Sequence, residues 1–346
     1  MRVPSMLVLG GGGILGEAWM LGVLAGIEQQ GGFDPRDCGG FIGTSAGSIV
    51  AATLAAGIPP ASRLADPRAT SRTAMTDAEQ GSNATRVPRG AGGAREAAAM
   101  RAGSDSDGAA PNAARLGLWP LQAVGTRAIG LADAIAGPLA SVALAGSAPG
   151  GALVRRGLLR RLGAGRRSLA MLTSMVDREH VRWDGRLVIV AVDERSGRRV
   201  AFGREGAPDA SVGTAVAASC AIPGFFRPVQ VGGRSYVDGG VWSPTNLDLA
   251  RVRRGEHVLC LNPTGSLRPT AGALAGAIGP VSRTIAATEA RALRARGAHV
   301  TIVNPDRDSA SAMGVNLMSP ARRSEVVAAA LAQGLEIGRA ESRSAA

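Results

Sequence analysis

Short apolar runs that end at glycine recur near the start of the chain. Residues 6–9 and 40–42 are such runs, and stretches that suit helices follow at about 16–30 and 49–56. Short apolar runs bounded by turn residues are typical of buried strands. Strands that alternate with helices predict a parallel sheet with helices packed on its faces.

Strand and helix signals return in the second half of the chain. Residues 187–192 form a strongly apolar run, and 199–203 follow it as a hairpin partner after a turn at 195–197. The remaining predicted elements are a hairpin over 229–237, strands at 257–261 and 300–303, and helices at 211–219, 280–296 and 320–338. These further elements continue the alternation of strands and helices and fit the same parallel sheet with helices on its faces.

The middle of the chain differs in composition. We predict one domain spanning 1–346 with a large insertion over 60–150, placed after the helix at 49–56. Within it, 66–114 is rich in small and charged residues, so it has little to bury and is predicted to be disordered or loosely held. Residues 116–148 are apolar but interrupted, and they are a candidate lid over a site.

A G-x-S-x-G motif, residues 43–47, stands between a predicted strand and a predicted helix. A nucleophilic serine on a sharp strand-to-helix turn needs small neighbours such as Gly43 and Gly47, because the turn brings the flanking residues together. The following helix directs its N-terminal amides at the serine and favours negative charge there. Ser45 is therefore a candidate nucleophile, although an ordinary serine cap gives the same pattern.

A glycine-rich loop, Gly11-Gly12-Gly13-Ile14-Leu15-Gly16, follows the first predicted strand. The spacing matches a dinucleotide-binding motif, but the acid expected after the second strand is replaced by Thr44 and Ser45. A P-loop is excluded because the chain has no lysine. The loop also suits an oxyanion hole, since the ends of neighbouring parallel strands would bring its amides beside Ser45, and a plain tight turn stays an alternative.

The third motif is Asp238-Gly239-Gly240. It follows the stretch Ala221-Ile222-Pro223-Gly224-Phe225-Phe226-Arg227-Pro228 and precedes Pro244-Thr245-Asn246. With the glycine loop and G-x-S-x-G before it, this ordered set resembles the patatin-like phospholipase family over most of the chain outside 60–150. The resemblance implies a three-layer α/β/α fold with a mostly parallel central sheet. It also implies acyl-ester hydrolysis by a serine lipid acyl hydrolase of phospholipase, lysophospholipase or esterase type, without metal or cofactor.

The resemblance also implies roles for individual residues. Ser45 is the nucleophile and Asp238 its base, while Gly11, Gly12 and Gly13 supply oxyanion-hole amides. Gly16, Gly43, Gly47, Gly239 and Gly240 support these motifs. Leu15 stands where the family commonly has a basic residue, so positive charge near the oxyanion is lost. A catalytic aspartate needs burial to raise its pKa from about 3.9.

Charge and composition bear on partners and location. All 39 basic residues of the 346 are arginine, 27 are acidic, and the net charge is +12. Residues 60–170 hold 15 Arg and seven acids, including an arginine cluster at 155–167, which favours transient contact with an anionic membrane surface. Few aromatics disfavour nucleic-acid binding. Three separated cysteines and the lack of a leader or spanning segment favour a cytoplasmic protein, peripheral at the membrane.

Two other functions stay open from the residues. One is an NAD(P)-binding oxidoreductase built on the glycine loop, and the other is a non-catalytic lipid-binding protein. His257 and His299 follow Asp238 in the order of a Ser–Asp–His triad, but each begins a predicted strand, at the end away from the expected site. The oligomeric state leaves no signal in the residues.

Overall fold

The computed structural model describes residues 2–64, 145, 151–162, 165–267 and 278–345. Contacts divide the chain into one unit of residues 1–64 and 119–346 and a second unit, 65–118, which lies wholly outside the described residues. The predicted disordered segment over 66–114 lies outside them too, as does the candidate lid over 116–148 apart from Ala145. The single-domain organisation with an insertion over 60–150 stays a prediction.

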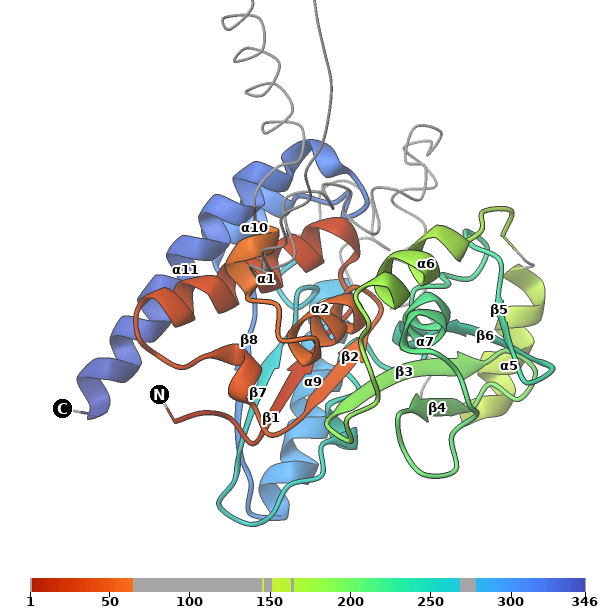
Figure 1. Cartoon of the computed structure of the whole chain (residues 1–346), viewed down its shortest axis with the longest axis horizontal. Helices are drawn as coiled ribbons and strands as arrows, with labels where there is room; N and C mark the ends of the chain where they lie inside the picture. Colours follow the sequence, from red (N-terminus) through yellow and green to blue (C-terminus); the bar gives the residue numbers. More distant parts are fainter. Residues whose placement is uncertain (1, 65–144, 146–150, 163–164, 268–277, 346) are drawn as a thin grey trace, which may run out of the picture. The chain divides into compact units, whose positions relative to one another are not determined.

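A mixed sheet forms the middle layer of the first unit (Figure 1). Its strand order is β5-β6-β3-β2-β1-β7-β8, with β4 paired to β3. The strands are β1 Met6–Leu9, β2 Phe41–Thr44, β3 Leu187–Asp193, β4 Arg199–Phe202, β5 Val229–Val231, β6 Arg234–Asp238, β7 His257–Leu261 and β8 His299–Val303. β3, β2, β1, β7 and β8 run parallel, whereas β4 and β6 pair antiparallel with β3.

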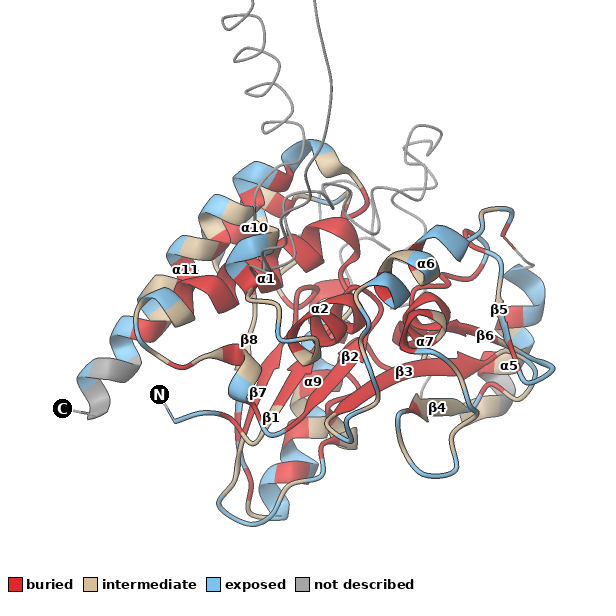
Figure 2. Ribbon diagram, in the orientation of Figure 1, coloured by how far each residue is buried: buried red, intermediate tan, exposed pale blue. Residues whose placement is uncertain are grey.

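Successive strand residues face opposite sides of the sheet, so each parallel strand supplies both cores. Leu7 and Leu9 of β1 are buried in one cluster, and Val8 between them is buried in the other. β3 is buried along its whole length, as Figure 2 makes visible. Burial on both faces explains why these strands are continuous apolar runs in the sequence.

Helices cover both faces. The larger core packs α1 Gly13–Gln29, α2 Ala46–Ala55, α6 Ala170–Arg178, α7 Val212–Ser219, α10 Arg307–Met313 and α11 Arg323–Ala345 against the sheet. The opposite face is covered by α9 Ile278–Ala295 and by α5 Gly151–Leu162. Short 3₁₀ turns lie at Pro35–Asp37, Pro60–Arg63, Gly239–Val241, Leu247–Leu249 and Pro320–Arg322. The predicted three-layer α/β/α fold is confirmed.

Close contact between α1 and α11 explains the composition of α1. A Cβ on Gly26 would lie 2.5 Å from the carbonyl oxygen of Leu331, and one on Gly22 would lie 2.7 Å from Cβ of Ala330. Nearly all of α1 is buried, as expected for a helix that is apolar on every side. It begins at Gly13, three residues before the predicted start, and α5, α6 and α10 were not predicted.

Candidate active site

Ser45 occupies a sharp turn between β2 and α2. Its φ of 51° and ψ of −123° are strained for a residue with a side chain. A Cβ on Gly43 would lie 2.4 Å from Cα of Ser48, and one on Gly47 would lie 2.0 Å from the carbonyl oxygen of Leu9. The two motif glycines are therefore required by close backbone approach, and the hydroxyl-bearing residue stays 8% exposed at the carboxyl end of β2.

Ser219, the last residue of α7, holds this turn in place. Its hydroxyl accepts the backbone N–H of Ser45 at 2.8 Å and donates to the carbonyl oxygen of Val190 at 2.6 Å. Ser219 is fully buried, so without its hydroxyl the Ser45 N–H would lose its acceptor and the Val190 carbonyl would lose a donor. Sequence reasoning missed this residue, because one more serine in a small-residue helix carries no signal of its own.

Asp238 ends β6 and is buried beside Ser45. Burial raises the pKa of its carboxyl from 3.8 to about 7, against the opposing effects of a hydrogen bond with the Ser45 side chain and one from Gly240 N–H. The Gly240 N–H donates to Oδ1 at 2.7 Å. A Cβ on Gly239 would lie 2.2 Å from the carbonyl oxygen of Val190, so Gly239 lets β6 approach β3 at this point.

The glycine loop at the end of β1 lies against the nucleophile turn. A Cβ on Gly11 would lie 3.4 Å from Cβ of Ser45. The N–H of Gly11 donates to the carbonyl oxygen of Pro244 at 2.9 Å, so it is already engaged. Within the described residues the N–H groups of Gly12 and Gly13 have no hydrogen-bond acceptor, which leaves these two free for a ligand. Gly16 packs against Pro263.

Asn246 joins the two halves of the site. Its side-chain amide donates to Oγ1 of Thr44 at 3.1 Å and to the carbonyl oxygen of Gly239 at 3.3 Å. These are the residues next to Ser45 and Asp238, so one side chain fixes the spacing between their strands. Sequence analysis quoted Asn246 only as context for the third motif. The adjacent Leu247 N–H donates to Oε2 of the partly buried Glu289 at 2.9 Å.

The structure also bears on two alternatives suggested by the sequence, a dinucleotide-binding loop and a histidine triad. Pro263 and Met318 pack on the glycine loop, where a Cβ on Gly12 would lie 2.6 Å from Cβ of Pro263 and one on Gly13 would lie 2.9 Å from Sδ of Met318. This packing disfavours a dinucleotide pyrophosphate on the loop. His257 and His299 lie opposite each other at the starts of β7 and β8, away from the carboxyl ends where Ser45 lies.

No metal centre is evident in this part of the chain. Among the described residues, no group of three or more His, Cys, Asp or Glu side chains lies close enough together to hold a metal ion. The side-chain groups available at the site are therefore the Ser45 hydroxyl and the Asp238 carboxyl, with backbone amides beside them. A hydroxyl, a basic carboxylate and amide donors can together perform acyl transfer.

The arginine cluster at 155–167 is not a uniform surface patch. Arg155 is 1% exposed and donates to the carbonyl oxygens of Val241 at 3.1 Å and Gly197 at 3.2 Å. Its guanidinium also stacks 4.3 Å from the ring centre of Trp242. The expectation of a membrane contact is therefore wrong for Arg155, which anchors α5 to the sheet, whereas Arg160 and Arg161 are exposed.

Comparison with known proteins relates the chain to a protein family. A family model for patatin-like phospholipases matches residues 7–251, which include all three sequence motifs. None of the curated proteins compared with the chain matches it. Within the described residues, no helix combines the length and apolar character that crossing a membrane requires.

Proposed function

The chain belongs to the patatin-like phospholipase family, and from this premise we propose that it hydrolyses lipid acyl esters through a dyad of Ser45 and Asp238. The observation that carries the proposal is the buried carboxyl of Asp238, which lies close enough to the side chain of Ser45, a serine on a strained turn, for that side chain to lower its pKa. Its pKa of about 7 suits a general base that works near neutral pH.

The reaction follows from these groups. Oγ of Ser45 attacks the acyl carbonyl carbon while its proton passes to Asp238, and the carbonyl oxygen becomes an oxyanion. When the tetrahedral intermediate collapses, the ester C–O bond breaks and the leaving alcohol takes the proton from Asp238. Water then attacks the acyl-serine, giving its proton to Asp238, and the free acid leaves as Oγ is reprotonated.

Charge on the oxyanion requires fixed donors. The N–H groups of Gly12 and Gly13 are the proposed donors, since that of Gly11 already donates to Pro244. The start of α1 at Gly13 adds its positive end at the same place. Loss of one such donor typically costs about 3 kcal/mol of transition-state stabilisation. Leu15 is fully buried and carries no charge, so in this proposal backbone amides alone stabilise the oxyanion at that position.

A fluorophosphonate probe and short-chain ester hydrolysis test the nucleophile. Ser45→Ala should abolish labelling and hydrolysis, whereas Ser174→Ala, an exposed serine on α6, should leave both unchanged. Full labelling or full activity in Ser45→Ala would reject the assignment, and the absence of labelling in the native protein would favour a non-catalytic lipid-binding protein.

The base has a separate test. Asp238→Asn should lower kcat by about 10²- to 10⁴-fold, the usual contribution of a general base. Asp193→Asn provides a matched control, because Asp193 is also buried but pairs with Arg234 on the surface side of the sheet. If His257→Ala or His299→Ala were as damaging as Asp238→Asn, a histidine triad would replace the dyad.

Substrate and location complete the proposal. We expect a lipid or other acyl-ester substrate, no cofactor, and a cytoplasmic protein that contacts anionic membranes transiently. Exposed Arg160 and Arg161, rather than Arg155, are the residues of the cluster available for that contact.

A further inference from the structure

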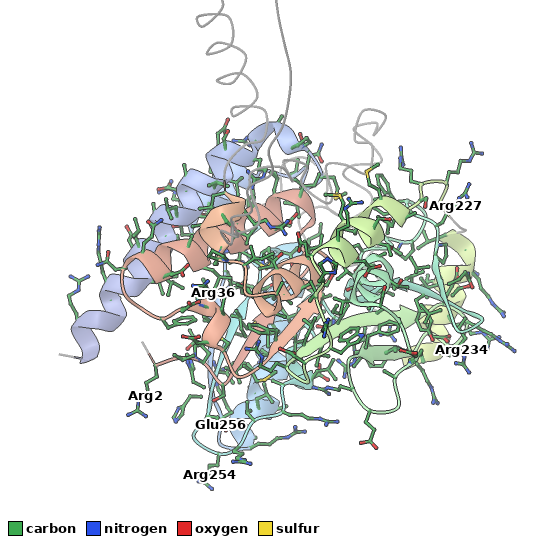
Figure 3. All side chains as sticks on the ribbon, in the orientation of Figure 1. Arg2, Arg36, Arg227, Arg234, Arg254 and Glu256 are labelled. Carbon is green, nitrogen blue, oxygen red and sulfur yellow. The ribbon has the colours of Figure 1, made fainter. Side chains whose placement is uncertain are left out.

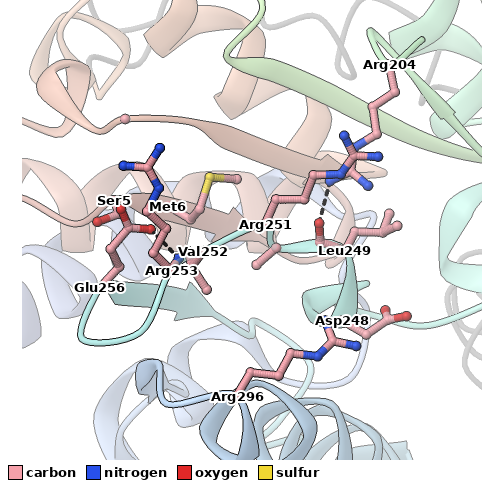
Figure 4. A pocket seen from close by; sticks show the side chains of 12 residues that line it. Ser5, Met6, Arg204, Asp248, Leu249, Arg251, Val252, Arg253, Glu256 and Arg296 are labelled. Carbon is pink, nitrogen blue, oxygen red and sulfur yellow. Dashed lines mark hydrogen bonds between the residues drawn. The ribbon is translucent and has the colours of Figure 1, made fainter.

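A pocket of about 860 Å³ opens at the edge of the sheet opposite the dyad (Figure 4). Its walls include Ser5 and Met6 at the start of β1 and the loop from Asp248 to Arg253. The four residues of β1 span roughly 13 Å at the usual rise per residue, and they separate Met6 from the glycine loop. The pocket is therefore distinct from the proposed catalytic site.

Positive charge dominates the pocket. Arg204, Arg251, Arg253 and Arg296 line it, against two acids, Asp248 and Glu256. They come from separate parts of the chain: Arg204 follows β4, Arg251 and Arg253 precede β7, and Arg296 follows α9. Figure 3 shows Arg254 and Glu256 at this same end of the molecule, together with Arg2. The fold thus gathers guanidinium groups that are distant in sequence.

Both acids already have partners. Asp248 receives two hydrogen bonds from Arg199, at 2.6 Å and 2.7 Å, in the forked geometry of a carboxylate–guanidinium pair. Oε2 of Glu256 accepts the backbone N–H of Arg253 at 2.7 Å. Neither acid forms an ion pair with an arginine that lines the pocket, so the charge of those arginines is not locally neutralised.

Three of the arginines are available to a ligand. The side chains of Arg251, Arg253 and Arg296 are exposed and make no hydrogen bond or ion pair with any residue that the structure describes. Arg204 is half-buried and donates to the carbonyl oxygen of Leu249. Burial lowers the pKa of Arg204, repulsion from Arg251 and Arg199 lowers it further, and Asp248 opposes the shift. Arg204 and Arg251 thus lie close enough to repel each other.

We propose that this pocket binds a multiply charged phosphate group, as a free phosphate compound or as a lipid headgroup. Planar guanidinium groups bind phosphate oxygens in pairs, and an anion between Arg204 and Arg251 would relieve their repulsion. The Ser5 hydroxyl lines the pocket as a further donor, without a hydrogen-bond partner among the described residues. A volume of about 860 Å³ accommodates a group larger than phosphate alone.

Pyrophosphate is the probe for the shared chemistry, measured by isothermal titration calorimetry on the full chain. The native protein should bind it, and Arg251→Gln combined with Arg296→Gln should weaken binding at least about tenfold, as loss of two charge-assisted contacts implies. The control combines Arg227→Gln with Arg291→Gln, which removes the same charge from exposed positions outside the pocket. Binding should also weaken as salt rises.

Vesicle co-sedimentation separates the two sources. A lipid headgroup is identified if three results are obtained together. The native protein co-sediments with phosphatidate vesicles, pyrophosphate competes it off them, and the pocket variant does not co-sediment. Pyrophosphate binding without pocket-dependent vesicle binding identifies a free phosphate compound. The proposal is overturned if neither probe binds, or if the pocket and control variants weaken binding equally. These binding assays do not depend on ester hydrolysis, so a negative result would reject the pocket proposal without affecting the proposed hydrolase activity.

Discussion

The native protein should become less stable as pH rises because Glu17 is buried, and Glu17→Gln should abolish this part of the pH dependence. Glu17 lies on α1, one turn after Gly13, and is 1% exposed. Its Oε2 has no hydrogen-bond partner within the described residues. Burial raises the pKa of this carboxyl from 4.5 to about 8, although Arg323 and Arg63 oppose the shift. Arg63 pairs with Glu179, and Arg323 donates to backbone carbonyls, so neither neutralises Glu17 directly.

The direction of the effect follows from proton binding. Above pH 4.5 the unfolded chain releases the Glu17 proton, whereas the folded protein retains it until about pH 8. The stability that the protonated carboxyl contributes is therefore fully present below pH 4.5 and is lost as pH rises toward 8. At about 1.4 kcal/mol per pH unit, the total loss is on the order of 5 kcal/mol.

Urea unfolding of the native protein and Glu17→Gln, followed by fluorescence and circular dichroism, measures this effect. The unfolding free energy of the variant, relative to that of the native protein, should increase by about 1.4 kcal/mol per pH unit between roughly pH 5 and 8. Asp238 and Glu289 also titrate in this range, but both proteins contain them, so their contributions cancel in the difference. Glu205→Gln, at an exposed position, controls for the lost charge. A difference that stays constant across the range would refute a neutral Glu17.

Three further predictions concern the site. Ser219→Ala leaves the buried Ser45 N–H without an acceptor and removes a donor from the Val190 carbonyl, so the unfolding free energy should fall by about 1–3 kcal/mol and kcat should fall with it. Unchanged denaturation midpoints would contradict this. Gly239→Ala places a methyl group 2.2 Å from the carbonyl oxygen of Val190 and should abolish activity and lower the melting temperature, both measurable on the purified variant. Ester hydrolysis should rise with pH through about 7, because Asp238 accepts a proton only when ionised, and a flat kcat/KM profile across that range would count against it as the base.

Local sequence patterns were enough to predict the sheet and the strands that carry the motifs. Runs such as 6–9 and 187–192 are buried on both faces, so every residue is apolar and the signal does not depend on partners. The glycines at 43 and 47 were predicted because backbone approach at a turn excludes any side chain there, whereas Gly239 was identified only through the family resemblance. Helix ends were less accurate, since the start of α1 depends on contacts with Leu317 and Pro263 far along the chain.

Polar residues whose partners are distant in sequence were decided by the tertiary structure alone. Arg155 is a charged residue of the kind usually found at the surface. Its burial is favourable because it donates to carbonyl oxygens 42 and 86 positions away and stacks on the Trp242 ring. Ser219 and Asn246 hold the nucleophile and base strands through bonds that span 174 and 202 positions. The arginine pocket likewise forms only in the folded chain, which brings together residues from the start of β1 and from several loops. Hydropathy assigns Arg155, Ser219 and Asn246 to solvent, whereas the hydrogen bonds that make their burial favourable are contributed by other segments.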